Sequence, residues 1–253
     1  MWNPFDFSGQ RILVTGASSG IGRATAIKLS EQGAEVCLFA RNEEAMKETL
    51  SMMSGSGHRC FVKDFGESGD FKDIFDDIVS DGHKIDGLVY CAGIANIVPV
   101  SSLNKKTMDE SMTVNLYSFI EMVGLLSKRK YHDTANIVGV SSISTLYPQK
   151  CQGLYVATKS AMNSLVTSLA LELANKGIRI NTVLPGATYT KMLLDCYEDK
   201  SYEAIEEAIH QQVLGLVDPK DVADIILFLL SDASKKITGR YICADGGYLD
   251  FSN

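Results

Sequence analysis

The stretch that decides the fold is residues 11–22, which reads RILVTGASSGIG. Its apolar start suits a buried β-strand, and a helical pattern follows its glycines. Glycine permits positive φ and lets backbone N–H groups approach an anion closely, while a helix N-terminus adds partial positive charge. We therefore predict a strand–turn–helix unit that holds the pyrophosphate of a dinucleotide, with an ordinary glycine-rich turn as the alternative. The residues expected to contact it are Gly16, Ser18, Ser19, Gly20, Ile21 and Gly22.

Short apolar runs alternate with helical patterns along the rest of the chain. Strands are expected at 11–15, 35–40, 59–63, 87–91, 136–141, 179–184 and 241–244, and helices near 21–32, 43–53, 70–80, 104–129, 153–176 and 219–231. Alternating strands and helices form parallel sheets with right-handed crossovers. The sequence shows no linker and no internal repeat. The sequence therefore predicts one α/β domain over residues 1–253, a doubly wound Rossmann fold with a seven-stranded parallel sheet and helices on both faces.

Composition excludes several classes of partner. Of the 253 residues, 22% are charged and 45% hydrophobic, as in ordinary globular proteins. The net charge of −7 argues against nucleic acid and anionic membranes as partners. No apolar stretch approaches the roughly 20 residues of a membrane helix, and the start of the chain lacks a signal-peptide pattern. The six cysteines show no metal-ligand spacing. We expect a cytoplasmic protein with no metal site.

The end of the second expected strand indicates which dinucleotide binds. Many dinucleotide folds place an acid there to bind the ribose hydroxyls. Here Ala40 takes that place and Arg41 follows, and a guanidinium forms charge-assisted bonds to a 2′-phosphate. The sequence favours NADP(H), with NAD(H) as the alternative. The interpretation without a binding role is that Arg41 is a solvated loop residue. Asp64 is expected either to accept from the adenine amino group or to be a surface turn acid.

Three residues suggest proton-transfer chemistry. Tyr155 and Lys159 share one helix face at four-residue spacing. A free tyrosine has a pKa near ~10, and a neighbouring ammonium brings the pKa of a phenol toward working pH. Ser142 ends the apolar run before them, at the strand end where doubly wound folds bind ligands. Its hydroxyl is placed to stabilise a developing alkoxide, so the three predict an acid/base site, although each alone reads as a surface or strand-end residue.

The segment from Ala187 to Val217 interrupts the strand–helix alternation. Its stretch Tyr202–Ile209 has apolar residues at helical spacing. The segment is predicted to be a substrate lid over the strand ends, with a plain surface helix pair as the alternative.

Taken together, the glycine motif at 15–22, Ser142 and the pair Tyr155 and Lys159 resemble the short-chain dehydrogenase/reductase family. The resemblance covers Arg11 to about Gly247, and the chain looks most like the bacterial 3-oxoacyl-(acyl carrier protein) reductase branch. Further matches in family order are Ala92-Gly93, Asn115, Pro185-Gly186, Thr190, Thr238-Gly239 and Asp245-Gly246-Gly247.

The resemblance implies a mechanism. Tyr155 acts as general acid/base, Lys159 lowers its pKa and binds the nicotinamide ribose, and Ser142 orients the carbonyl. Asn115 holds a water that links Lys159 to solvent. The resemblance also implies cofactor contacts from Ala92, Gly93, Tyr155, Lys159, Pro185, Gly186, Thr188 and Thr190. Relatives are commonly homodimers or homotetramers built through the two long helices, here 104–129 and 153–176.

Two departures from the family pattern stand out. Tyr90-Cys91 replaces two asparagines that usually tie neighbouring strands together, so that tie is expected to be lost. Ser19 stands where many NADP-using relatives carry a basic residue, which leaves more of the phosphate recognition to Arg41.

The substrate remains a class: a ketone or secondary alcohol, among them a carrier-bound acyl thioester, a sugar and a steroid-like ring. The expected pocket wall comes from residues near 94–100, 143–151 and 187–213, including Ile143, Leu146, Tyr147, Met192 and Leu193. A non-catalytic dinucleotide-binding sensor or scaffold is the alternative from another class. A sugar-nucleotide epimerase relative is a further alternative, although those chains are usually longer.

Overall fold

The computed structural model of the protein describes residues 3–67, 69, 71–197 and 211–248. Seven strands form one sheet in the order β3-β2-β1-β4-β5-β6-β7, and every neighbouring pair is parallel. The strands are β1 (Arg11–Thr15), β2 (Glu35–Ala40), β3 (Arg59–Val62), β4 (Gly87–Tyr90), β5 (Ala135–Val140), β6 (Ile178–Pro185) and β7 (Tyr241–Ala244). The order reverses between β1 and β4, so the predicted doubly wound sheet is confirmed.

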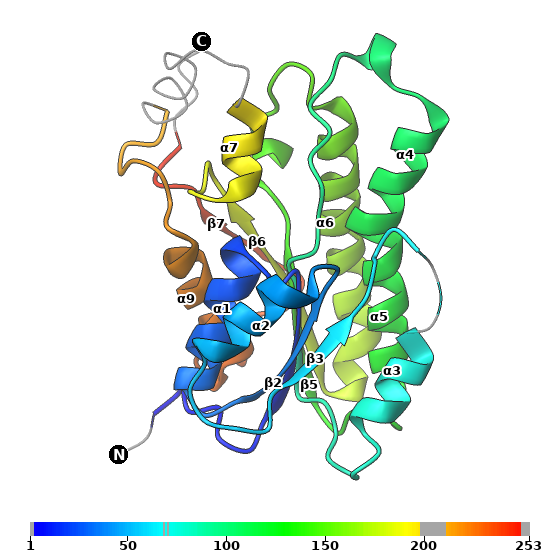
Figure 1. Ribbon diagram of the computed structural model, residues 1–253, viewed down its shortest axis with the longest axis vertical. Coiled ribbons are helices and arrows are strands. Elements are labelled where there is room, and N and C mark those ends of the chain that lie inside the picture. Colours follow the sequence, from blue (N-terminus) through cyan, green and yellow to red (C-terminus); the bar gives the residue numbers. More distant parts are fainter. Residues whose placement is uncertain (1–2, 68, 70, 198–210, 249–253) are drawn as a thin grey trace.

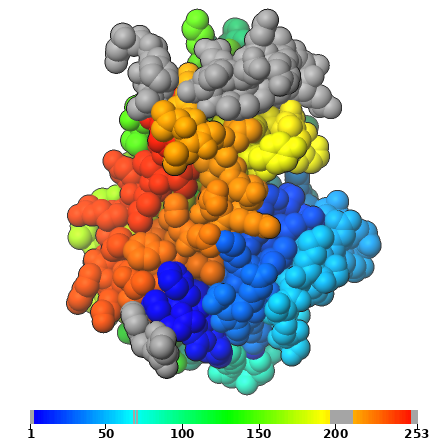
Figure 2. Space-filling view, turned by 90° about the vertical axis from the view of Figure 1, so that its left-hand side faces the viewer, coloured from blue at the N-terminus to red at the C-terminus, as the bar shows by residue number. Residues whose placement is uncertain are grey.

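Helices cover both faces of the sheet (Figure 1). One layer packs α1 and α2 with α9, and Figure 2 shows the orange surface around α9 beside the blue surface of α1. The other layer packs α3, α5 and α6. The helices are α1 (Gly20–Glu31), α2 (Glu43–Ser51), α3 (Phe71–Ile78), α4 (Lys105–Met112), α5 (Ser118–Leu126), α6 (Gly153–Leu173), α7 (Lys191–Tyr197) and α9 (Pro219–Leu230).

The central strands are buried because apolar side chains cover them on both sides. Alternate residues of β1 face opposite layers: Leu13 packs with α3, α5 and α6, while Ile12 and Val14 pack with α1 and α9. This is why β1 reads as a continuous apolar run rather than an alternating one.

The expected helix at 104–129 is helical from Lys105 to Leu126 but is not α-helical throughout. It consists of α4, a π-helical segment at Thr113–Tyr117, and α5. A π-helical turn adds a residue to the helix and often lies at a functional site. Asn115 is one of the residues of this π-helical segment. Amphipathic spacing alone does not distinguish such a turn from α-helix, because both bury one face.

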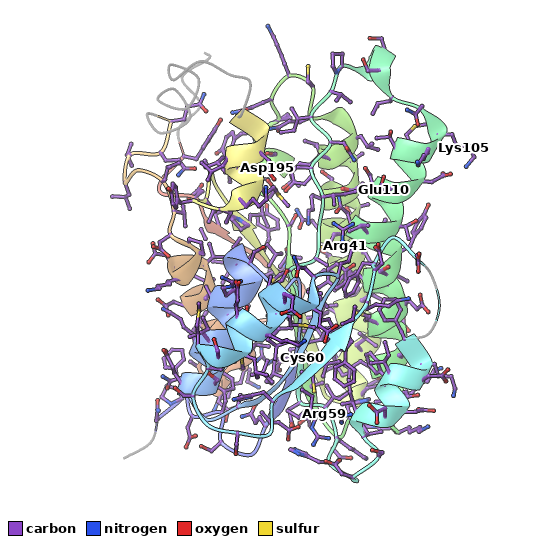
Figure 3. All side chains as sticks on the ribbon, viewed as in Figure 1. Arg41, Arg59, Cys60, Lys105, Glu110 and Asp195 are labelled. Carbon is purple, nitrogen blue, oxygen red and sulfur yellow. The ribbon has the colours of Figure 1, made fainter. Side chains whose placement is uncertain are left out.

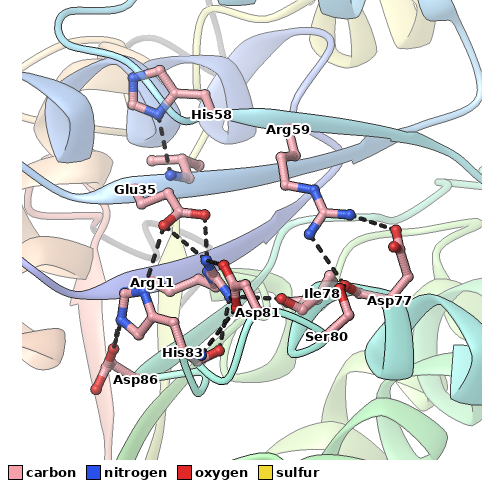
Figure 4. A network of polar contacts seen from close by, with 11 residues as sticks. Arg11, Glu35, His58, Arg59, Asp77, Ile78, Ser80, Asp81, His83 and Asp86 are labelled. Atoms are coloured by element: carbon pink, nitrogen blue, oxygen red, sulfur yellow. Dashed lines mark hydrogen bonds and ion pairs between the residues drawn. The ribbon is translucent and has the colours of Figure 1, made fainter.

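A charged network stabilises the amino-terminal ends of the strands, opposite the end at which the strands' carboxyl termini lie (Figure 4). Arg11, only 3% exposed, lies between Glu35, at 2.8 Å, and Asp81, at 2.6 Å. Its guanidinium also donates to the carbonyl oxygens of Ile78 and His83. The network ties β1 and β2 to the loop that follows α3.

Within the described part of the chain, no helix has the length and apolar character needed to cross a membrane. The predicted helix at Tyr202–Ile209 lies outside the described residues.

Candidate active site

A cavity of about 460 Å³ opens at the carboxyl ends of the strands, around the point where the strand order reverses. Doubly wound folds bind their ligands at this place. The predicted site residues that line the cavity are Gly16, Ser18, Ser19, Gly20, Ile21, Gly22, Arg41, Asp64, Ala92, Gly93, Ser142, Tyr155, Lys159, Pro185, Gly186, Thr188 and Thr190. Asn115 does not line it and is completely buried behind the cavity wall.

The glycine-rich turn is built for close approach of its backbone. A Cβ on Gly22 would lie 2.3 Å from the carbonyl oxygen of Gly16, so only glycine fits. Gly16 itself has φ +65°, a conformation that L side chains rarely adopt. No acidic residue occupies the first turn of α1, and the Ser19 side chain makes no capping bond. The turn and the helix N-terminus therefore fit a pyrophosphate group.

Arg23 fixes this turn from behind. Its guanidinium donates to the carbonyl oxygen of Ser18 at 2.6 Å and to that of Ala45 at 3.0 Å. No sequence pattern singles out Arg23, because a cation on a helix looks like an ordinary surface residue.

Arg41 and Asp64 lie together at one end of the cavity. Arg41, labelled in Figure 3, follows the carboxyl end of β2. Its side chain is 63% exposed. Its guanidinium lies 3.8 Å from the carboxylate of Asp64, which also accepts from the backbone N–H of Gly66. A guanidinium and a carboxylate thus both face the end expected to hold the adenosine moiety.

At the other end, α6 brings Tyr155 and Lys159 to the end of β5. The Lys159 ammonium donates to the carbonyl oxygen of Val140 at 2.8 Å and lies 5.9 Å from the centre of the Tyr155 ring. Burial lowers the pKa of Lys159 to about 8. Ser142, two residues beyond the end of β5, is 8% exposed and lines the same cavity. Ser141 also lines the cavity, and its side chain donates to the carbonyl oxygen of Lys159 on α6.

Asn115 positions the wall behind Lys159. Its side chain accepts from the N–H of Ile94 at 2.8 Å and donates to the Ile94 carbonyl and to Thr158 Oγ1, both at 3.0 Å. A Cβ on Gly93 would lie 3.3 Å from the Lys159 Nζ and 3.4 Å from Asn115 Oδ1. The absence of a side chain at Gly93 therefore leaves room for Lys159 and Asn115 to converge.

The expected loss of the tie between strands is not what the structure shows. Thr15 Oγ1 accepts from the N–H groups of Cys91 and Ala92 at 3.0 and 2.9 Å, so β1 stays tied to the end of β4. The buried Tyr90 hydroxyl donates to the carbonyl oxygen of Val114 at 2.6 Å. Tyr90 therefore holds the π-helical segment that carries Asn115, a function that its sequence position alone does not reveal.

The substrate end differs from the expected wall in part. Ile143, Tyr147, Met192 and Leu193 line the cavity as predicted, and Leu146 does not. Gln149 lies within the predicted range 143–151, whereas two further polar residues that line the cavity, Gln152 and Tyr248, lie outside the predicted ranges. Tyr248 reaches the cavity because Gly246 and Gly247 both have positive φ and turn the chain beyond β7 back toward it. The adjacent glycines were the signal available in the sequence.

Comparisons with known proteins agree with this geometry. A family model described as enoyl-(acyl carrier protein) reductase matches residues 16–249. A glucose 1-dehydrogenase from Gluconobacter oxydans is 33% identical over 98% of this chain and 96% of its own length. A 3-oxoacyl-(acyl-carrier-protein) reductase from Rickettsia conorii is 31% identical over 96% and 98% of the two chains.

Solved structures extend the likeness to the whole architecture. A short-chain type dehydrogenase/reductase from Mycobacterium ulcerans superposes with a TM-score of 0.86, at 27% identity over 96% of this chain and 90% of its own. A 3-oxoacyl (acyl-carrier-protein) reductase from Agrobacterium tumefaciens C58, solved with NADP bound, gives a TM-score of 0.85 at 27% identity over 96% of both chains.

The fold, the cavity and the relatives together define a Rossmann-type oxidoreductase. The chain belongs to the short-chain dehydrogenase/reductase family, as the resemblance implied, and the sensor or scaffold alternative is not favoured.

Proposed function

We propose that the protein is an NADP(H)-dependent oxidoreductase that interconverts a ketone and a secondary alcohol, with Tyr155 as proton donor and acceptor. The observation that carries the proposal is the convergence of Ser142, Tyr155 and Lys159 on one cavity whose other end is the glycine-rich turn. A nicotinamide dinucleotide bound in this cavity would supply the hydride to the carbonyl carbon, or would accept it in the reverse direction.

The three side chains divide the remaining work. Ser142 donates a hydrogen bond to the substrate oxygen and polarises the carbonyl. Tyr155 then delivers its phenolic proton to that oxygen, which becomes the hydroxyl. The Lys159 ammonium stabilises the negative charge left on the phenolate. Asn115 supports this arrangement by fixing the Ile94 backbone and Thr158 beside Lys159. We also propose that Asn115 holds a water molecule that links Lys159 to solvent, through which Tyr155 regains its proton.

The residues around the cavity fit the cofactor. Gly16 to Gly22 and the N-terminus of α1 bind the pyrophosphate, and Arg41 binds a 2′-phosphate. Ala92 and Gly93 contact the adenosine side, while Pro185, Gly186, Thr188 and Thr190 contact the nicotinamide side. The Thr190 methyl group lies 3.1 Å from where a Gly20 Cβ would be, so we assign Thr190 a contact with the pyrophosphate as well.

The segment 187–217 is proposed as the lid over the substrate. Its described ends support this, because Met192 and Leu193 of α7 and Gln211 all line the cavity. Gln212, 2% exposed, joins the two ends by hydrogen bonds to both backbone groups of Ala187 and to the carbonyl oxygen of Gly215.

The position of the basic cluster Lys128-Arg129-Lys130 does not support a substrate that is delivered on an acyl carrier protein. It lies at the amino-terminal edge of the sheet, since the following Tyr131 hydrogen-bonds Ile85 just before β4. There Arg129 donates to the Asp133 carbonyl and Lys130 pairs with Asp76. The relatives named for glucose and for 3-oxoacyl substrates leave both classes open to test.

The deciding experiment measures NADPH oxidation with a panel of ketones, keto sugars and an acetoacetyl thioester, using wild type and Tyr155→Phe. We expect turnover with at least one carbonyl, and a loss of about 100-fold or more in the variant because its proton donor is gone. NADPH affinity should change only a few fold. Tight NADPH binding without turnover on any carbonyl contradicts the proposal, and so does a fully active variant.

A further inference from the structure

The mouth of the cavity carries a cluster of neutral polar side chains, here called the amide cluster: Tyr147, Gln149, Gln152, Gln211 and Tyr248. Its members come from three parts of the chain, namely the segment between β5 and α6, the end of the proposed lid, and the residues after β7. All five line the same cavity as Ser142 and Tyr155. The proposed function leaves the amide cluster without a role.

Direct contacts hold the amide cluster together. The rings of Tyr147 and Tyr248 stack with their centres 5.1 Å apart and their planes 27° from parallel. Gln149 Nε2 donates to Gln211 Oε1 at 3.2 Å and to the Tyr248 hydroxyl at 3.3 Å, and that hydroxyl donates to Gln211 Oε1 at 2.8 Å. The side chains therefore have defined positions at the mouth rather than independent ones.

The amide cluster keeps hydrogen-bonding capacity that it does not use. Among the residues that the structure describes, Gln149 Oε1, Gln152 Nε2 and Gln211 Nε2 have no hydrogen-bond partner. An amide offers two donors on nitrogen and two lone pairs on oxygen, which matches the mixed donor and acceptor character of a hydroxyl group. Tyrosine rings add apolar faces that suit the C–H groups of a carbon chain bearing hydroxyls.

Charged side chains are few near the amide cluster. The described lining residues include one carboxylate, Asp64, at the opposite end beside Arg41. Two bases line the cavity near the amide cluster, namely the exposed Lys150 and Lys191, which pairs with Asp195. A mouth of three amides and two phenols is a poor apolar channel for an acyl chain, because burying unpaired amides against hydrocarbon is costly.

From these observations we infer that the amide cluster selects a neutral, polyhydroxylated carbonyl substrate, a keto sugar or its polyol, by hydrogen-bonding the hydroxyls away from the reacting carbon. The inference rests on the proposed carbonyl reduction and adds its substrate class. Gln149, Gln211 and Tyr248 are then specificity-determining residues, which act on substrate binding and leave proton transfer to Tyr155.

The test compares pentuloses with 2-pentanone, which has the same carbon chain without the extra hydroxyls, and with acetoacetyl-N-acetylcysteamine as the thioester. NADPH oxidation is followed for the wild-type protein. We expect kcat/KM for the best pentulose to exceed that for 2-pentanone by about 100-fold, since several hydrogen bonds of roughly fivefold to tenfold each contribute. The thioester should also fall below the best pentulose.

Two variants separate substrate recognition from structural support. Gln149→Leu should raise KM for the pentulose about tenfold and leave kcat/KM for 2-pentanone within twofold. Tyr248→Phe keeps the ring stack, loses one hydroxyl and should raise the pentulose KM about fivefold. Gln10→Leu, the same exchange in the turn before β1 and outside the cavity lining, is the control and should change neither substrate.

Each contrary result has a distinct meaning. Turnover of 2-pentanone or the thioester at least as efficient as that of every pentulose overturns the substrate class and leaves the proposed function standing. An equal loss on pentulose and ketone in Gln149→Leu and Tyr248→Phe shows that the amide cluster only supports the structure. Failure to reduce any of the three classes overturns the proposed function and the inference together.

Discussion

Lys159 is the residue in which burial and chemistry conflict most clearly. It is 4% exposed, and burial disfavours its charged form, so its pKa falls to about 8. The charge is nevertheless the feature that supports Tyr155. One hydrogen bond to the Val140 carbonyl offsets only part of the lost hydration. We conclude that Lys159 serves the proposed reaction at the expense of the stability of the ligand-free protein.

This conflict predicts a pH dependence. The pKa of Lys159 is about 8 in the folded protein and 10.5 in an ordinary lysine. Between these values the unfolded chain holds a proton that the folded protein lacks, so the contribution of Lys159 to stability rises with pH. Relative to Lys159→Met, the wild-type free energy of unfolding should increase by about 3 kcal/mol from pH 7.5 to 10.5. Urea unfolding of ligand-free protein at several pH values measures it; a constant difference contradicts it.

Arg41 governs the cofactor preference that we propose. Its guanidinium is 63% exposed, and its ion pair within the described part of the chain is the long, 3.8 Å contact with Asp64, so it remains available to a 2′-phosphate. Arg41→Ala should weaken NADPH binding roughly tenfold, because a bond to a charged group is lost, and should leave NADH binding unchanged. Fluorescence titration with both nucleotides measures this. Arg240→Ala, an exposed arginine outside the cavity lining, is the matched control, and equal losses for both nucleotides would remove Arg41 from phosphate recognition.

At the scale of elements, the π-helical segment Thr113–Tyr117 does what a regular helix would not. It leaves the Val114 carbonyl free to accept from Tyr90, and it turns Asn115 toward Ile94 and Thr158. One irregular turn thus joins the end of β4 to α6 beside Lys159.

The Tyr90 hydroxyl is the clearest test of that element. Tyr90→Phe removes the donor and leaves the buried Val114 carbonyl without its partner, which should lower the free energy of unfolding by about 1–3 kcal/mol. Urea unfolding measures the loss. Tyr241→Phe, at a tyrosine that is 52% exposed, is the control and should change stability little. A Tyr90→Phe protein as stable as wild type would mean that water takes the place of the phenol.

The central strands were predictable to within a residue or so because their apolar runs report burial on both faces. The site residues tied to motifs, such as Gly22 and Tyr155, were predictable for a related reason, since each position tolerates few side chains. Tyr90 and Tyr248 were not, because their partners, Val114 and Gln211, lie far away in the sequence. No local pattern records a contact that only the folded chain creates.

At the scale of the whole molecule, the exposed apolar residues of the α5 and α6 region suggest assembly. Leu171 on α6 is 85% exposed, and Tyr117 and Ile120 are 52% and 41% exposed. We propose a homodimer or homotetramer formed through these helices. Leu171→Glu should shift the mass by light scattering toward the 27.6 kDa of one chain, because a buried charge opposes association.

The control for assembly is Met52→Glu, which places the same charge at a residue that is 53% exposed after α2. It should leave the mass unchanged. A wild-type protein that is already monomeric, or a Leu171→Glu protein that still assembles, would contradict the proposed interface.

The network around Arg11 has a consequence for engineering. Its ion pairs with Glu35 and Asp81 brace the edge of the sheet farthest from the cavity, whereas the segments around the mouth are joined largely by neutral side chains such as Gln212. The ion pairs that stabilise the sheet and the segments that would bind substrate therefore lie at opposite ends of the strands. These ends are called here the braced pole and the recognition pole. Loops at the recognition pole can be exchanged for those of another enzyme while the braced pole keeps the scaffold intact, which makes this chain a suitable recipient for grafted specificity.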